Sequence, residues 1–388
     1  MFKKILQLLY PILITYNNLL IQPIEASDIK GAVLETGLIN CYPEDELDEG
    51  GHPLPGSPST VVFDGQRLIF GNDKNPQERF LSPVFTIDFP HLQTNLQKSP
   101  IHYLTHPLFK NLLKYESSTL TLNGKIVIMS GCFGTLQSLF PLQACCRNHT
   151  LISFPVDHPE KVSVIAPFTL EGTLCSLPVR KTMEKLLCTA EHPTGMPFIN
   201  VEGLACIPGN RLVFGVRQIG ENWSKNTNTI LLMAVTYQII NEKVILFNDF
   251  EILYQINPHA LLKTPAPLGL AALEYDKYNN QILLLTTYEI DDHGTNDKIG
   301  TFLWALSLDD LLAQKPPILV KTPEGNPLFF PHKLEGLTFV EKDTLFLVAD
   351  DDHIFLHPDN TPYRHKNQAV YFIVKLSDSP TNFQPNVN

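Results

Sequence analysis

Residues 201–217 read VEGLACIPGNRLVFGVR, and residues 334–350 read LEGLTFVEKDTLFLVAD. Each stretch begins near Glu-Gly-Leu, continues as a short apolar run, passes through a polar turn and ends with a second apolar run. This is the pattern of a β-hairpin, and its return far along the chain is typical of folds that repeat one sheet unit around an axis. Both stretches end on a charged residue, Arg217 or Asp350, so the repeat bears on function as well as on fold.

Three further units follow the same strand–turn–strand pattern: STVVFDGQRLIFGND (59–73), STLTLNGKIVIMSG (118–131) and LGLAALEYDKYNNQILLLTTYE (268–289). Strand-like sequence follows the last three of the five units, which is the order expected of a four-stranded propeller blade. We therefore predict an all-β fold, a β-propeller with five visible blade repeats.

Two segments bear on the number of blades and on how the ring closes. Residues 150–198 form either a sixth, irregular blade or an insertion, and the sequence leaves both open. The early stretch GAVLETGLI (31–39) is expected to close the ring by supplying a strand to the last blade. Only short helical turns are expected, at 183–187 and 308–314.

The N-terminal segment has the pattern of a secretory signal peptide. Lys3 and Lys4 precede an apolar stretch, and Ile-Glu-Ala at 24–26 provides a small-residue cleavage site. The alternative is an uncleaved membrane anchor, which Pro11 and two asparagines make less suitable. We predict a signal peptide at 1–26, a single propeller domain at 27–378 and a flexible tail at 379–388. The mature protein would then be exported, periplasmic or extracellular, with no stable membrane span.

Charge and cysteine content limit the partners and the redox chemistry. The formal net charge of −11 argues against nucleic acid as a partner. Seven cysteines in an exported chain permit disulfides but leave at least one thiol free. Cys132 with Cys145 or Cys146, and Cys175 with Cys188, are plausible pairs by proximity, with the connectivity open. Cys206 falls in an apolar strand and is expected to be a buried thiol. The oligomeric state is left open.

The ends of the second strands supply the first candidate site. The sequence contains no nucleophile elbow, zinc-protease helix or phosphate-binding loop, and no catalytic nucleophile is assigned. Aligning the units places Asp73, Arg217, Thr287 and Asp350 at equivalent points, which converge on one face of a propeller. A carboxylate-rich mouth of this kind suits a hard cation such as calcium. The alternative is that the acidic residues merely end strands in solvated loops.

Glu202 and Glu335 form the second candidate site. Each opens an inner strand and precedes a glycine that permits close backbone approach. A buried carboxylate requires a cation, a metal or backbone N–H groups. The fourth unit carries Leu268 at this position in our alignment, so the ring is not symmetric. Metal binding and a purely structural role are both open here. Arg217 could pair with these glutamates as scaffold or bind an anionic ligand.

The remaining candidates line the same face. Glu289 follows Thr287 by two residues, and Asp351 and Asp352 follow Asp350. His332 lies on the approach to the strand of Glu335 and could act as a general base, although a surface role is the alternative. We therefore predict Glu202, Glu335 and Asp350 as metal ligands, with ligand-binding roles for Arg217, Asp73, Glu289, Asp351 and His332.

The units at 201–217, 268–289 and 334–350 resemble the blade motifs of the phytase-like (esterase-like activity of phytase) propeller family and of related propeller proteins of unknown function. The resemblance covers about residues 196–375 well and the first half by pattern only. It implies hydrolysis of phosphate esters or other esters. Calcium-dependent propeller hydrolases and lactonases hold the ion with acidic and amide ligands in the central channel, and here Glu202, Glu335 and Asp350 match that idea.

Two functions of different classes follow from these observations. The first is a calcium-assisted hydrolase of a small phosphoester or ester, in which the ion polarises the ester oxygen or activates water. Arg217 would then steady an anionic group, with Asp73 and Glu289 at the mouth. The second is a non-catalytic scaffold whose face loops engage a protein or a glycan.

Overall fold

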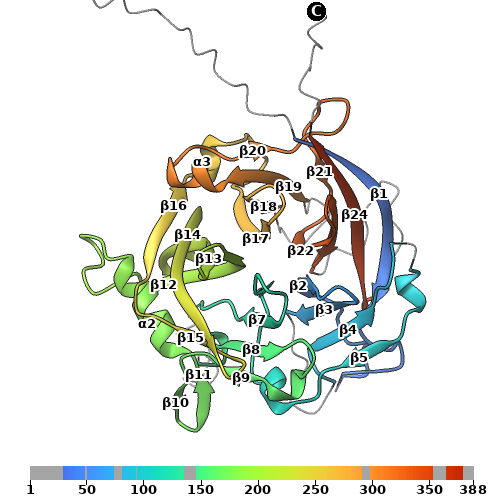
Figure 1. Cartoon of the computed structure of the whole chain (residues 1–388), viewed down its shortest axis with the longest axis horizontal. Coiled ribbons are helices and arrows are strands. Elements are labelled where there is room, and N and C mark those ends of the chain that lie inside the picture. The colour runs from blue at the N-terminus through green and yellow to red at the C-terminus, as the bar shows by residue number, and fades with distance from the viewer. Residues whose placement is uncertain are drawn as a thin grey trace, which may run out of the picture.

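The computed structural model describes residues 29–48, 50–73, 81–92, 94–134, 146–290, 298–352 and 364–378. Within these ranges, five antiparallel sheets are arranged around a central axis, and the chain passes through them in sequence order (Figure 1). The inner strand of each sheet contacts the inner strands of both neighbours, which closes the ring. The fold is therefore a five-bladed β-propeller, as predicted from the repeats.

The blades are numbered in chain order. Blade 1 contains β2 (Pro58–Phe63), β3 (Arg67–Asn72), β4 (Val84–Asp88) and β5 (Ile101–Tyr103). Blade 2 contains β6 (Ser117–Leu120), β7 (Ile126–Ser130), β8 (Leu151–Pro155) and β9 (Ser163–Val164). Blade 3 contains β12 (Phe198–Ile207), β13 (Arg211–Asn222), β14 (Lys225–Ile240), β15 (Lys243–Leu246) and β16 (Glu251–Ile256). Blade 4 contains β17 (Gly269–Asp276), β18 (Gln281–Ile290), β19 (Lys298–Ser307), β20 (Ile318–Leu319) and β21 (Phe329–Phe330). Blade 5 contains β22 (Leu334–Glu341), β23 (Thr344–Ala349), β24 (Gln368–Asp378) and the N-terminal β1 (Ile29–Asn40).

The ring is closed by the two ends of the described chain. β1 pairs antiparallel with β24 from Ile29↔Asp378 to Asn40↔Gln368 (Figure 1). The first strand therefore completes the last blade, as expected for residues 31–39. The predicted signal peptide at 1–26 and the tail at 379–388 lie outside the described residues.

The five inner hairpins follow from local sequence. Gly65 and Gly124 adopt φ values of +100° and +71°, which side chains disfavour, so the Asp-Gly and Asn-Gly dipeptides set these turns. Asp64 Oδ1 accepts the backbone N–H of Gln66 at 2.8 Å and fixes the first turn. Between the blades, aliphatic and aromatic side chains of neighbouring sheets pack into buried apolar clusters. These clusters hold the blades together by burial of apolar surface.

The segment 150–198 is not a sixth blade. Its first part supplies β8 and β9 to blade 2. The rest is an insertion, formed by the hairpin of β10 (Phe168–Leu170) and β11 (Thr173–Cys175) and by helix α2 (Leu177–Leu186). The helix is longer than the turn predicted at 183–187, because its apolar face, including Val179 and Met183, packs into the core between blades 2 and 3.

One disulfide within the described residues fastens this insertion. Cys146 bonds to Cys175. The pairs that proximity made plausible, Cys132 with Cys145 or Cys146 and Cys175 with Cys188, do not form, because Cys132 and Cys188 are free. Cys132 and Cys206 are buried free thiols, and Cys188 is an exposed one. The expectation of a buried thiol at Cys206 is therefore confirmed.

The remaining short elements lie in connections. They are helix α3 (Leu308–Leu312), near the predicted turn at 308–314, and the 3-10 turns η1 (Leu96–Lys98), η2 (Pro107–Lys110), η3 (Pro159–Lys161) and η4 (Pro258–Ala260). Among the helices that the structure describes, none has the length and apolar content that a membrane span needs.

Candidate functional site

The strand register confirms the predicted equivalence of the second strands. Four residues occupy the same step of the ladder in their blades: Asn72, Val216, Thr286 and Ala349. The residues that follow them are Asp73, Arg217, Thr287 and Asp350. Blade 3 therefore brings a guanidinium to this end of the channel. Blades 5 and 1, which lie next to each other in the ring, each bring a carboxylate. We call this end of the channel the mouth.

The inner strands carry β-bulges opposite these positions. The register skips one residue in four blades, at Ser59, Glu202, Ala271 and Glu335. A bulge re-aims the side chain of its extra residue, so the two glutamates are bulge residues of blades 3 and 5. The fourth-blade equivalent is Ala271, and our alignment on Leu268 was wrong by three residues. The alignment matched Leu268-Gly269 to the Glu-Gly pairs of blades 3 and 5 by the shared glycine. The hydrogen-bond register, and not residue identity, decides which positions are equivalent.

The glycines after the bulges allow the blades to approach. A Cβ on Gly203 would lie 2.6 Å from Leu273 Cγ of blade 4. A Cβ on Gly336 would lie 3.1 Å from both Cγ1 and the backbone N of Val61 in blade 1. Both distances are below ordinary contact, so the predicted close approach at Gly203 and Gly336 is confirmed.

Arg217 joins the two glutamates across the axis. Its Nη1 lies 3.7 Å from Glu202 Oε1 and 3.5 Å from Glu335 Oε1. Its Nη2 lies 4.0 Å from Glu289 at the more open edge. Gly269 leaves space for the Arg217 side chain, because a Cβ at that position would lie 2.8 Å from Arg217 Cγ. Arg217 therefore has the internal pairing that we expected of a scaffold residue, and it brings Glu202, Glu335 and Glu289 together.

Lys333 extends this network into blade 5. Its Nζ lies 3.1 Å from Glu335, 2.7 Å from Asp352 and 3.9 Å from Glu289. Sequence reasoning placed Asp352 in the carboxylate-rich mouth without assigning it as a ligand, and it missed Lys333. The available signal was alternation along the strand, since Lys333 precedes Glu335 by two residues and residues so spaced share a strand face.

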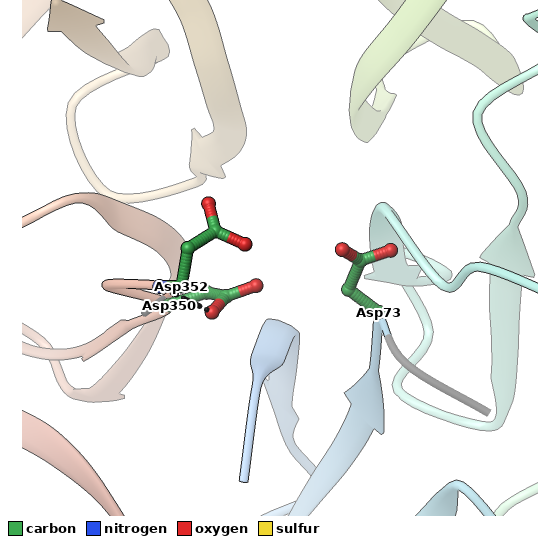
Figure 2. A group of neighbouring side chains, drawn as sticks. All are labelled: Asp73, Asp350 and Asp352. Atoms are coloured by element: carbon green, nitrogen blue, oxygen red, sulfur yellow. Dashed lines mark hydrogen bonds between the residues drawn. The ribbon is translucent and has the colours of Figure 1, made fainter. Parts of the chain in front are cut away.

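Three aspartates converge beside this network. Asp73 of blade 1 faces Asp350 and Asp352, which follow β23 of blade 5 (Figure 2). One carboxylate oxygen of each lies within 4.8 Å of the others. We call these three residues the aspartate group. Asp350 is fully buried, and its carboxylate accepts the Asp352 backbone N–H at 3.0 Å and the Ser59 hydroxyl at 3.4 Å.

The aspartate group has a donor set that fits a hard divalent cation. Carboxylate oxygens are the ligands that calcium prefers. At an effective dielectric constant of about 20, two unit charges 4.8 Å apart repel by roughly 3–4 kcal/mol. Two lysines offset part of this repulsion, because Lys333 contacts Asp352 and Lys114 Nζ lies 3.0 Å from Asp73. Lys114 also pairs with the buried Glu116 at 3.1 Å, and sequence reasoning missed both residues.

Asp351 and His332 form a different, buried pair. Asp351 Oδ2 lies 2.7 Å from His332 Nδ1, and its Oδ1 accepts the Lys333 backbone N–H at 2.9 Å. Burial raises the pKa of Asp351, but the His332 hydrogen bond and the charge of Arg364 outweigh it and hold the pKa below its ordinary value. The pair connects the loop after β23 to the residues that precede β22. Asp351 and His332 therefore both make contacts that hold these two segments together.

The two glutamates titrate near neutrality. Burial raises the pKa of Glu202 to about 7, and the charge of Glu335 adds to the rise while Arg217 opposes it. Burial likewise raises the pKa of Glu335 to about 7, against the nearby Lys333. Glu202 Oε1 accepts a hydrogen bond from Asn200 at 2.6 Å, whereas its buried Oε2 has no hydrogen-bond partner in the described part of the chain. Glu202 can therefore exchange a proton at neutral pH through an oxygen that is not otherwise engaged.

Comparison with known proteins found similarity to solved structures, and none to a protein-family model or a curated sequence. No protein-family model matches it, and no curated protein matches its sequence at a significant level. Among solved structures, it is similar to a member of the DUF4221 family from Bacteroides vulgatus, at 10% identity and a TM-score of 0.43, covering 91% of this chain and 99% of that one. It is also similar to a luciferin-regenerating enzyme, at 11% identity and a TM-score of 0.35, covering 88% and 97%.

A third similar structure is the PQQ-bound form of an aldose sugar dehydrogenase from Streptomyces coelicolor, at 9% identity and a TM-score of 0.35, covering 91% of this chain and 99% of that one. All three are β-propeller proteins. At these values the likenesses say nothing about the chemistry at the mouth, and the resemblance to the phytase-like family stays a prediction.

Proposed function

We propose that the protein is an exported hydrolase of phosphate esters or other esters that uses a calcium ion at the mouth of the propeller. One observation carries this proposal: the aspartate group lies in the same ion-pair network as a buried glutamate that titrates near neutrality. The link runs from Asp352 through Lys333 to Glu335, and from Glu335 through Arg217 to Glu202. Cation ligands and an acid–base group therefore belong to one ion-pair network.

In this proposal Asp73, Asp350 and Asp352 hold the ion. Asp350 keeps the metal role that the sequence indicated, whereas Glu202 and Glu335 are occupied with Arg217 and take other roles. A bound calcium ion would supply Lewis-acid polarisation of the ester oxygen. Lys114 and Lys333 would lose part of their pairing with the aspartates on binding, which leaves positive charge for an anionic substrate.

Glu202 is the group that we assign to proton transfer. With a pKa of about 7 it is part ionised at neutral pH and can take a proton from the attacking water. The water oxygen bonds to the phosphorus or carbonyl carbon, the bond to the leaving oxygen breaks, and the proton passes from Glu202 to that oxygen. Arg217 stabilises the negative charge that develops beside it.

The test measures calcium binding and hydrolysis on the same preparation. Purified protein is titrated with calcium by calorimetry and assayed with p-nitrophenyl phosphate and p-nitrophenyl acetate, with calcium or with chelator. We expect Asp352→Asn, a part-exposed position, to weaken calcium binding about ten-fold or more. Glu202→Gln should lower kcat about 100-fold or more while calcium binding persists.

The matched control is Asp343→Asn. Asp343 is a half-exposed carboxylate in the β22–β23 turn of the same blade, where it pairs with Lys375 at 2.7 Å. Its substitution should change neither binding nor rate. Rates that stay at background with both substrates, with and without calcium, would overturn the hydrolase. Unchanged melting temperatures on adding calcium would overturn the ion site.

A specific feature favours the scaffold as the second candidate function. β13 and β14 form a long hairpin whose turn carries Trp223, and this side chain is 54% exposed. Exposed tryptophan is frequent at sites that bind proteins and glycans. We propose that this hairpin is the contact surface if the mouth proves inactive. A glycan array that shows no binding by the wild type, or equal binding by Trp223→Ala, would count against it.

A further inference from the structure

The opposite end of the central channel holds a pocket of about 360 Å³. All five inner hairpins contribute to it near their turns, and we call it the turn-end pocket. Its lining includes Phe63 of blade 1, Thr121 of blade 2, Cys206 of blade 3, Glu274 of blade 4 and Phe339 of blade 5. A volume of this size accommodates a small organic molecule.

A constriction separates this pocket from the mouth. Midway along the channel, the Thr60 and Ser118 hydroxyl groups hydrogen-bond to each other between blades 1 and 2. Only about 10 Å³ of space remains there, bounded by Gly203, Gly336 and neighbouring inner-strand residues. That is about enough for one water molecule, so the turn-end pocket is a separate site.

Glu274 is the distinctive polar group of this pocket. Its carboxylate accepts the backbone N–H of Phe339 from the adjacent blade, and within the described residues it forms no ion pair. Burial raises the pKa of Glu274 to about 8, which the nearby Asp276 augments, while Phe339 N–H and Lys277 oppose the rise. A carboxylate that is desolvated and has no cationic partner is stabilised by a ligand that brings positive charge.

Aromatic side chains line the same pocket as this carboxylate. Phe63, Tyr275, Tyr278 and Phe339 line the pocket, and the rings of Tyr278 and Phe339 meet edge to face at 6.3 Å. The Tyr278 ring makes a cation–π contact with Lys277, whose Nζ lies 5.2 Å from the ring centroid. The other charged groups in the lining are Asp64, which is paired with Arg67, and Glu341. Acidic groups therefore outnumber the one lysine in the lining.

We propose that the turn-end pocket binds a small organic cation, an alkylammonium, with Glu274 as its counter-ion and Phe63, Tyr278 and Phe339 as its aromatic walls. A pocket that combines a carboxylate with aromatic side chains suits an ammonium group, because ring faces attract a cation and the carboxylate neutralises it. An anionic ligand would meet uncompensated negative charge. A neutral ligand would leave Glu274 without a cationic partner.

The test compares choline with its neutral carbon analogue, 3,3-dimethylbutan-1-ol. Binding is followed by NMR or calorimetry on the full chain, above the pKa of Glu274 and in the presence of chelator. We expect choline to bind at least about ten-fold more tightly than the alcohol. Glu274→Gln should remove that preference, and Tyr278→Leu, at an exposed position, should weaken choline binding. Glu341→Gln, a carboxylate in the same lining, is the control and should retain most of the affinity.

Three results would overturn the proposal: equal affinity for choline and the alcohol, absence of binding by either, or full choline affinity in both Glu274→Gln and Tyr278→Leu. The outcome is independent of the proposed hydrolase. Chelator removes calcium from the assay, and Asp352→Asn, which alters the mouth, should leave choline binding unchanged.

Discussion

The two ends of the central channel are built from the same five hairpins, yet they differ in chemistry. At the mouth, buried ions from several blades neutralise one another around Arg217 and Lys333. At the turn end, aromatic rings line a pocket with Glu274, a carboxylate that has no ion pair in the described part of the chain. The mouth therefore depends on contacts between blades, whereas the turn end depends mainly on residues beside each local turn.

Removing the central cation of the mouth should have the largest effect. Arg217→Met leaves Glu202 and Glu335 buried without their shared partner, so we expect a loss of about 3–5 kcal/mol in the free energy of unfolding above the pKa of both glutamates. The matched change at the turn end is Lys277→Met, an exposed cation over Tyr278, which should cost less than about 1 kcal/mol. Urea denaturation measures both, and similar losses would show that the two ends do not differ in this way.

The blade-to-blade approach beside the mouth gives the next largest effect. Gly203→Ala places a Cβ 2.6 Å from Leu273 Cγ, and we expect a cost of about 1–3 kcal/mol. In blade 4 the equivalent residue is Ala272, which follows the bulge at Ala271 and already has a Cβ. Ala272→Gly should therefore cost only about 0.5–1 kcal/mol. Thermal unfolding compares the pair, and a tolerated Gly203→Ala would contradict the close packing of blades 3 and 4.

The smallest expected effect is on the pH dependence of stability, which should differ between the two ends of the channel. Glu202 has a pKa of about 7 in the folded protein against an ordinary 4.5, so unfolding releases a proton between these values and stability falls as pH rises through that window. Glu202→Gln should flatten this fall by up to about 1 kcal/mol per pH unit. For Glu274 the window extends to about pH 8. Denaturation across this range tests both, and Glu274→Gln curves that parallel the wild type up to pH 8 would refute its desolvation.

The hairpins and their equivalent ends could be predicted from the sequence because they depend on local patterns. Asp-Gly and Asn-Gly set turns, alternating apolar runs set strands, and strand lengths then placed Asp73, Arg217, Thr287 and Asp350 at matching points. The closing strand at 31–39 followed from the same pattern.

The bulges could not be predicted in this way. A bulge adds one residue without altering the apolar pattern strongly, so the Leu268 alignment failed where the register places Ala271. Lys333 and Lys114 were also missed. Their importance comes from partners in other segments, such as Lys114 with Asp73, which no local spacing reveals.

The sequence by itself therefore determined the propeller, its five hairpins and the polar character of one end, because these depend on interactions between residues close along the chain. Only the tertiary structure decided which charges meet. Closing the ring brings Asp73 of the first blade beside Asp350 and Asp352 of the last, and it places Arg217 between Glu202 and Glu335. The pKa values near neutrality arise from the same closure, because burial and neighbouring charge exist only once the blades have packed.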